Sequence, residues 1–582
     1  MPILHSWITN RYFCLSLEAI FALLIVVIAF TVPNVGCRWF ALAERSLTQA
    51  ARRPRRAILS VMLFAIGGRA VLLPLIHIPE PWMQDEFSYL LAGETYALGR
   101  VTNQPHPMWP NFESVHILQQ PTYISMYAPA QGLFLAMGEK VAGQPWIGAW
   151  TSVVLMSGAI CWMLEAWLPA PWAFVGGLLV IIRWGLFSYW INSYWGGAVP
   201  AFAGALIAGS LPRLLRWRRI RDSFFLGLGL ALLANSRPYE GLIFSATTGI
   251  AFLAWAAKRN LWRRIARPGL MTVLSLMLGI TAAGMLYCNW RVTGTALELP
   301  YVADRDQYAI APLFLCADLK PEPVYRASSL RRVYEAEVKL YRKGRSAAGV
   351  PEMLRKFKDF WIFYLGPLLS IPIVASCLLS STFKDERRRF FLLILAGMLG
   401  ALLLEVWFYP HYASPAMAVI IALILLGMRE LRSWQWRGKP AGLFLVRAIP
   451  TAVLLLGLVP ITALVLNLPL DYWPLQWYGG SPGVVQPPSL TAQVTAEHRK
   501  ALVFVRYSLT HDLSEEWVYN KPEIDKAPVV WARELDPTHD ASLIRYFSNR
   551  SVWLFEPDKH PWKLQPYTPA LESQRSSSPP FQ

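Results

Sequence analysis

Two adjacent carboxylates are the residues whose type and spacing most directly suggest chemistry in this sequence. Asp85 and Glu86 stand in the run Gln-Asp-Glu-Phe-Ser-Tyr, shortly after a long apolar stretch. One carboxylate of such a pair can accept a proton from an attacking hydroxyl, and the other can hold a cation or a second hydroxyl. The alternative is an acidic helix start that faces water, because Asp and Glu are favoured in a first helical turn. Residue types alone leave both interpretations open.

A second group of residues is suited to binding an anion. Arg237, Tyr239 and Glu240 lie in the run Asn-Ser-Arg-Pro-Tyr-Glu between two apolar stretches. A guanidinium at the end of a membrane span can hold a phosphate, or it can simply extend to the membrane surface. Arg183 lies inside an apolar stretch, where a charge costs about 2.5–3.5 kcal/mol on insertion scales. It therefore needs a partner, either a carboxylate or a phosphate that approaches from the outer half of the membrane.

Aromatic and polar residues form a third group near the ends of other apolar stretches. Asn192, Tyr194 and Trp195 follow one stretch, and His411 lies in the run Tyr-Pro-His-Tyr, shortly after Glu405. Aromatic residues in such places are typical of an interfacial belt. They also suit a platform for sugar rings, with Asn192 binding hydroxyls. His411 is a candidate polar ligand or acid–base group, and solvation of an ordinary loop histidine is the alternative.

Long apolar runs must position these residues. Hydrophobic residues make up 54% of the 582 residues and charged residues 16%, against about 25% charged in soluble domains. Because about 20 apolar residues span a bilayer, we expect about twelve membrane-spanning helices. The expected spans are Leu17–Val32, Ala57–Ile76, Ile147–Trp167, Trp172–Ile191, Gly196–Leu211, Ser223–Ala234, Leu242–Ala257, Leu270–Cys288, Trp361–Leu379, Phe390–Phe408, Ala413–Met428 and Ile449–Leu466.

The distribution of charge predicts the orientation of these spans. The net charge of +18 comes largely from short Arg-rich clusters between apolar runs, where a membrane protein needs them, so we exclude nucleic acid as a partner. If the first cluster is cytoplasmic, simple alternation of the expected spans puts every later cluster on the same side. The loops 77–146 and 289–360, and the chain after residue 467, then face outward. We therefore expect a multi-pass protein of the inner (plasma) membrane with a periplasmic C-terminal domain.

Three regions follow from this topology. Residues 1–56 hold the first span and a basic cytoplasmic loop, residues 57–467 form the main transmembrane domain, and residues 468–582 lie outside. In the last region a linker precedes three short runs rich in Val, Phe and Trp, which predict strands, and one predicted helix. These elements are Pro469–Ser489, Ala501–Tyr507, Pro528–Glu534, Ser551–Glu556 and Ala541–Phe547. The sequence thus predicts an all-α polytopic membrane protein with a small C-terminal α/β extramembrane domain and a disordered tail.

A further motif adds a family resemblance. The run Tyr127-Ala128-Pro129-Ala130-Gln131-Gly132 precedes the next expected span. Together with the Asp-Glu pair that opens the first outer loop, it resembles the GT-C glycosyltransferases, in particular the protein O-mannosyltransferases and the aminoarabinose transferases acting on lipid A. The resemblance covers residues 57–290. Ala128 stands where those families often have a second proline, and the C-terminal region does not match theirs.

The resemblance implies a sugar donor on a polyprenyl phosphate, presented from the membrane lipids at the outer face. An acceptor hydroxyl, on an envelope glycan, lipid or protein, would attack the anomeric carbon in a single inverting displacement. Asp85 matches the family's base or acceptor ligand, Glu86 would support the acceptor or a metal, and Tyr127 and Gln131 join the substrate-binding candidates. No set of metal ligands is assigned. Some of these enzymes need a divalent cation such as Mg or Mn and others do not, so the cofactor stays open.

Three other classes of protein stay open. One is a polymerase or ligase that moves whole glycans, and another is an envelope scaffold with an outer recognition domain. The third is a transporter of lipids or glycans, which predicts paired charges inside the membrane and internal repeats; the sequence shows no repeat. The glycosyltransferase interpretation makes a geometric prediction of its own, that Asp85, Arg237 and His411 open onto one outer cavity.

Overall fold

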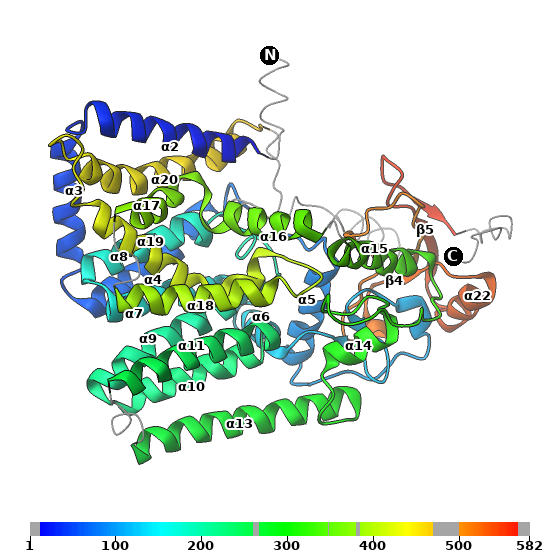
Figure 1. Cartoon of the computed structure of the whole chain (residues 1–582). Helices are drawn as coiled ribbons and strands as arrows, with labels where there is room; N and C mark the ends of the chain where they lie inside the picture. Colours follow the sequence, from blue (N-terminus) through cyan, green and yellow to red (C-terminus); the bar gives the residue numbers. More distant parts are fainter. Residues whose placement is uncertain (1–11, 260–266, 347–348, 380–384, 469–499, 568–582) are drawn as a thin grey trace.

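The computed structural model describes residues 12–259, 267–346, 349–379, 385–468 and 500–567. Most of these residues are helical, and the helices pack side by side in a bundle (Figure 1). The C-terminal strands and their helix lie at one end of this bundle, together with the segments that connect the helices at that end (Figure 1).

The bundle consists of helices whose sequences are mostly apolar. Several of them begin at a proline, whose fixed φ angle suits the first helical position. They are α2 (Phe13–Thr31), α3 (Cys37–Ala50), α4 (Pro54–Leu72), α7 (Trp146–Trp167), α8 (Ala170–Val180), α9 (Ala198–Trp217), α10 (Ile220–Ala234), α11 (Pro238–Lys258), α13 (Pro268–Thr293), α17 (Gly366–Leu379), α18 (Glu386–Leu402), α19 (Met417–Leu431) and α20 (Ala441–Val465).

Within the described ranges, seven helices are long and apolar enough to cross a bilayer, or eight if the bent pair α16 (Gly349–Tyr364) and α17 is one span. The chain is thus a multi-pass membrane protein, but the expectation of about twelve spans is not confirmed. The difference comes from shorter or more charged helices. α8 has 11 residues and α10 has 15, while α4 carries Arg55, Arg56 and Arg69.

The expected span Trp172–Ile191 is not a continuous helix. α8 ends at Val180 and continues into a π-helical turn, η2 (Ile181–Gly185), and the chain is irregular from there to Gly197. π-Helical turns inside helices are frequent at functional or otherwise constrained sites. Here the irregular chain carries the aromatic residues that the sequence placed at a span end.

Shorter elements at one end of the bundle surround the candidate site. They are α5 (Gln84–Ala97), η1 (Trp109–Phe112), β1 (Ile117–Leu118), β2 (Ile124–Ser125), α6 (Pro129–Ala142), α14 (Pro300–Tyr308), α15 (Ser328–Arg345) and η3 (Pro410–Ala416). α5 and α6 pack closely through two glycines. A Cβ at Gly132 would lie 2.7 Å from the Cβ of Ala92, and one at Gly93 would lie 2.8 Å from the Cβ of Leu135. This approach therefore excludes larger side chains and fixes the helix that carries Asp85.

The C-terminal domain is a four-stranded sheet with strand order β4-β3-β5-β6. β3 (Ala501–Val505) pairs in parallel with β4 (Val529–Arg533) and β5 (Ser551–Phe555), and β6 (Leu564–Pro566) pairs antiparallel with β5. α22 (Pro537–Tyr546) connects β4 to β5, and η4 (Ile524–Lys526) precedes β4. All five residues of β3 are buried, as expected for the central strand of a parallel sheet.

The three predicted strands and the predicted helix of this domain are confirmed, and β6 was not predicted. The proposed linker Pro469–Ser489 and the C-terminal tail lie outside the described residues.

Candidate functional site

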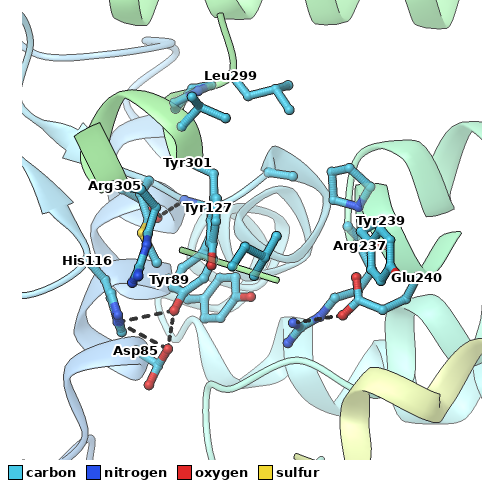
Figure 2. Close-up of a pocket in the computed structure, with 18 of the residues that line it drawn as sticks. Asp85, Tyr89, His116, Tyr127, Arg237, Tyr239, Glu240, Leu299, Tyr301 and Arg305 are labelled. Carbon is cyan, nitrogen blue, oxygen red and sulfur yellow. Dashed lines mark hydrogen bonds and ion pairs between the residues drawn. The ribbon is translucent and has the colours of Figure 1, made fainter. Parts of the chain in front are cut away.

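A cavity of about 640 Å³ lies where the ends of α11 and α13 meet α5, α14 and α15. Asp85, Arg237 and His411 all line it, so the expectation that these three residues open onto one cavity is met. Leu513 and Ser514 of the C-terminal domain line it as well. In Figure 2, Asp85 and Arg237 lie on opposite sides of this space.

Asp85 forms a compact cluster with a histidine and a tyrosine on one wall. Tyr127 Oη donates a hydrogen bond to Asp85 Oδ1, and His116 Nδ1 lies 3.3 Å from the same oxygen and 3.2 Å from Tyr127 Oη (Figure 2). The ring of Tyr89 stacks on that of Tyr127 with 4.4 Å between centroids. Because Asp85 lies in the first turn of α5, its carboxylate is also favoured by the helix dipole.

The backbone conformation at His116 places its ring next to Asp85. His116 has φ +65°, in the left-handed region that only a few per cent of non-glycine residues adopt, although Asn, Asp and His adopt it more often than others. Its carbonyl accepts hydrogen bonds from Ser88 Oγ at 2.6 Å and from the Met126 amide at 3.2 Å. These bonds hold the strained turn and with it the position of the imidazole.

The cluster is charged rather than neutral. Burial alone would raise the pKa of Asp85, but His116 beside it and the hydrogen bond from Tyr127 outweigh burial and hold that pKa below its ordinary value. Conversely, burial would lower the pKa of His116, but the Asp85 carboxylate outweighs burial and raises it. These two shifts favour an ionised Asp85 carboxylate beside a protonated His116, and an ionised carboxylate is the form that can accept a proton.

Arg237 supplies the positive charge of the opposite wall. It precedes Pro238, and the residue before a proline is disfavoured in helical conformation, so α11 begins there. Its guanidinium lies 4.7 Å from the ring centroid of Tyr412 and 3.4 Å from Glu240 Oε1. Only 13% of its side chain is exposed. A buried guanidinium with donors facing a cavity is well suited to a phosphate.

Other predicted site residues divide between the cavity and its supports. Tyr127, Trp195, Tyr239, Glu240 and His411 line the cavity. The hydroxyl of Tyr239 bonds to the Ala401 carbonyl at 3.1 Å. His411 Nδ1 lies 2.9 Å from Tyr189 Oη, so its hydrogen-bond partner is this tyrosine; Glu405, six residues earlier in the sequence, could also have paired with it.

Four of the predicted site residues lie behind the cavity wall and do not line it: Glu86, Gln131, Asn192 and Tyr194. Glu86 accepts hydrogen bonds from the amides of Trp82, Met83 and Tyr194, and burial raises its pKa to about 7. Gln131 donates to the Tyr194 carbonyl at 3.1 Å, and Asn192 donates to two backbone carbonyls. These side chains therefore fix the irregular chain after η2 against α5 and α6.

Arg183 has the structural partner that the sequence left open. It forms an ion pair with Glu18 of α2, with 3.1 Å between Nη1 and Oε1, and both side chains are 1% exposed. It also donates to the Leu365 carbonyl at 3.1 Å. Arg183 does not line the cavity, so the carboxylate alternative describes it and the phosphate alternative does not.

A metal ion does not fit the carboxylate pair. Among the described residues no group of three or more His, Cys, Asp or Glu side chains could hold one. Glu86 turns its oxygens to backbone amides while Asp85 faces the cavity, so the two carboxylates do not converge on one point. The Mg or Mn cofactor left open by the sequence therefore has no two-carboxylate site here.

Several lining residues were missed by sequence reasoning. Tyr301 and Arg305 come from α14, and Glu405 comes from the segment after α18. Arg305 pairs with Glu337 of α15 at 3.0 Å and lies 4.7 Å from the ring centroid of Trp407. For Tyr301 and Arg305, the available sequence signal was the mixture of charges and tyrosines in the outer loop 289–360.

Comparison with protein-family models gives no match, and comparison with curated proteins gives none either. Solved structures are similar in fold. The oligosaccharyltransferase of Archaeoglobus fulgidus tethered with an acceptor peptide matches at 11% identity and TM-score 0.39, over 77% of this chain and 62% of that one. ArnT from Cupriavidus metallidurans bound to undecaprenyl phosphate matches at 12% identity and TM-score 0.45, over 85% and 92%.

AglB from Archaeoglobus fulgidus, in complex with an inhibitory peptide and a dolichol-phosphate, matches at 12% identity and TM-score 0.42, over 86% of this chain and 69% of that one. This chain thus spans less than two thirds of the tethered oligosaccharyltransferase, 62% of its length.

Proposed function

We propose that this protein is a membrane glycosyltransferase that moves a sugar from a polyprenyl-phosphate donor to an acceptor hydroxyl. The observation that carries the proposal is the placement of the Asp85 carboxylate and the Arg237 guanidinium on facing walls of one cavity. The motif resemblance of residues 57–290 to GT-C enzymes points to the same reaction.

In the proposed reaction the acceptor oxygen attacks the anomeric carbon as the bond from that carbon to the phosphate oxygen breaks. The electron pair of the broken bond goes to the phosphate, whose charge Arg237 neutralises. The acceptor hydroxyl gives its proton to Asp85. Attack from the face opposite to the phosphate inverts the anomeric configuration, which matches a base and a cation on opposite walls.

The walls of the cavity suit a lipid-linked sugar. Leu242, Met285 and Cys288 contribute apolar lining from α11 and α13, and Leu242 is 65% exposed on the outer surface of the bundle. Trp195 and Tyr239 add aromatic faces, which pack against sugar rings. We place the reaction on the periplasmic face of the plasma membrane, with an envelope glycan, lipid or protein as acceptor.

A transporter is less well supported. A transporter is expected to have paired charges inside the bundle, and Arg183 and Glu18 do form such a pair. Neither residue lines the cavity, however, and the pair connects α2 to the turn after α8. We therefore assign this pair to the structure of the bundle.

Transfer by the purified full chain in lipid nanodiscs tests the proposal. The donors are polyprenyl-phosphate hexoses and pentoses, and the acceptors are envelope extracts. Asp85→Asn removes the base and should lower transfer on the order of 10²–10⁴-fold. Arg237→Ala removes the phosphate partner and should lower it on the order of 10²–10³-fold.

Asp318→Asn and Arg291→Ala are matched controls, because both residues are exposed and neither lines the cavity. Both controls should transfer like the wild type. Equal transfer by all five proteins would reject the site. Failure of the wild type to consume any lipid-linked donor would reject the class of enzyme, and transfer of whole glycans would identify a ligase.

A further inference from the structure

Glu405 is a buried carboxyl on the cavity wall that the proposed reaction does not yet use. It lines the same cavity as Arg237 and Glu240 and is 2% exposed. Its Oε1 has no hydrogen-bond partner among the described residues. A buried polar atom without a partner costs about 1–3 kcal/mol, so this carboxyl on the cavity wall has hydrogen-bonding capacity that the described residues do not use.

The backbone around Glu405 is held on both sides. The amide of Val406 donates to the Leu313 carbonyl at 2.9 Å, and the amide of Leu315 donates to the Leu404 carbonyl at 2.8 Å. Lys356 Nζ donates to the carbonyl of Glu405 itself. The carboxyl is therefore placed at a fixed point of the wall.

Glu405 shares its surroundings with a second carboxylate. The titratable groups around it come from α11, α14, α16 and η3 and from the residue before α11; they are Tyr239, Glu240, Tyr301, Lys356, Tyr412 and Arg237. Arg237 is already paired with Glu240, and Lys356 is directed at backbone carbonyls. Two buried carboxylates that share one guanidinium cannot both ionise easily.

This competition favours the protonated form of Glu405. Burial, and after it repulsion from Glu240, raises the pKa of Glu405 well above the ordinary range of a glutamate, although Arg237 and Lys356 oppose the change. In this form the side chain carries an O–H group, which can donate a hydrogen bond.

We propose that Glu405 is a neutral hydrogen-bond donor to the leaving phosphate, acting beside Arg237. This inference rests on the proposed glycosyl transfer and names a second contact for its leaving group. As the bond between the anomeric carbon and the phosphate oxygen breaks, the electron pair moves to the phosphate, and the Glu405 O–H donates to a phosphate oxygen without giving up its proton. The acceptor's proton goes to Asp85, so the step balances.

Two substitutions at this position separate the proposal from its alternatives. Glu405→Gln keeps a donor of the same shape and should keep kcat/KM within about 3-fold of the wild type, since an amide N–H replaces the carboxyl O–H. Glu405→Ala removes the donor and should lower kcat/KM on the order of 10²-fold. Asp85→Asn, which also converts a carboxyl to an amide, should inactivate the enzyme, so it is the matched contrast.

Binding of undecaprenyl phosphate to the protein in nanodiscs gives a second readout that needs no transfer. Glu405→Ala should bind this lipid about 10-fold more weakly than the wild type and Glu405→Gln should not. As the pH rises, the wild type loses the Glu405 proton, so its binding should weaken relative to that of Glu405→Gln. Thermal denaturation of each variant establishes that it is folded.

Each outcome decides the proposal. If Glu405→Gln fails as badly as Glu405→Ala in folded protein, the site needs a carboxylate and the proposal is wrong. It is also wrong if Glu405→Ala transfers sugar and binds lipid like the wild type. If the wild type binds undecaprenyl phosphate in a Glu405-dependent way but transfers no sugar, the glycosyl transfer fails while the phosphate contact stands.

Discussion

At the scale of single residues, the contact with His116 helps to hold the pKa of Asp85, the proposed base, below its ordinary value. Asp85 was predicted from its type and position, and so were Arg237 and His411. His116 was not, because its role depends on a left-handed backbone angle and on hydrogen bonds from Ser88 and Met126. Neither feature can be recognised in the sequence around a single loop histidine.

The effect of His116 on Asp85 leads to a prediction about pH. Asp85 must be ionised to accept a proton, so activity is lost as the pH falls through its lowered pKa. In His116→Gln the imidazolium is absent and burial, which raises the pKa, dominates. The acid side of the pH profile of kcat/KM should therefore move to higher pH in this variant.

His539→Gln is the control for this measurement, because His539 is exposed and pairs with Asp536 away from the cavity. Its profile should match that of the wild type. An acid side that stays in place, or moves to lower pH, in His116→Gln would mean that His116 does not set the charge of Asp85.

At the scale of elements, apolar patterning predicted most helices but not the break after α8. The run Trp172–Ile191 is uniformly apolar apart from Arg183, and periodicity cannot show that its helix ends in a π turn. At this turn Arg183 contacts Glu18, 165 residues earlier in the chain, and a contact so distant leaves no local pattern. The count of about twelve spans is not confirmed for a related reason, because length and hydropathy do not distinguish a short buried helix from a full span.

This ion pair gives a prediction about stability. Removal of one partner from a buried pair leaves an unpaired charge and costs about 3–5 kcal/mol. Glu18 also accepts a hydrogen bond from the Leu368 amide, so Glu18→Leu should lower the melting temperature of the protein in detergent strongly. The double variant Glu18→Leu/Arg183→Met should recover much of the loss, because the unpaired charge is gone.

The single variant Arg183→Met must be measured as well, so that a double-mutant cycle gives the coupling of the two residues. Additive effects of the two substitutions would show that the pair does not hold α2 against the turn after α8.

At the scale of the whole molecule, the C-terminal domain is part of the site and not an independent appendage. Its strands were predicted, but its docking was not, because the contacts join residues more than 400 positions apart: Asn111 to Asp540, and Arg533 to the Glu113 carbonyl. The amide of Glu516 donates to the Trp82 carbonyl, directly before α5. Such long-range contacts depend on the assembled fold and leave no local pattern.

This docking carries the segment after β3 to the cavity, where Ser514 forms part of the lining and the next residue, Glu515, forms a β-bridge with Met83 at the start of α5. A bulky side chain there should obstruct the acceptor more than the lipid donor, whose phosphate we propose to bind at Arg237. Ser514→Tyr should therefore raise the acceptor KM on the order of 10-fold and leave binding of undecaprenyl phosphate unchanged.

Leu509→Tyr is the matched control, because Leu509 belongs to the same segment, is 85% exposed and does not line the cavity. If the two variants behave alike, or if Ser514→Tyr weakens lipid binding as much as acceptor use, the C-terminal domain does not form the acceptor side of the site.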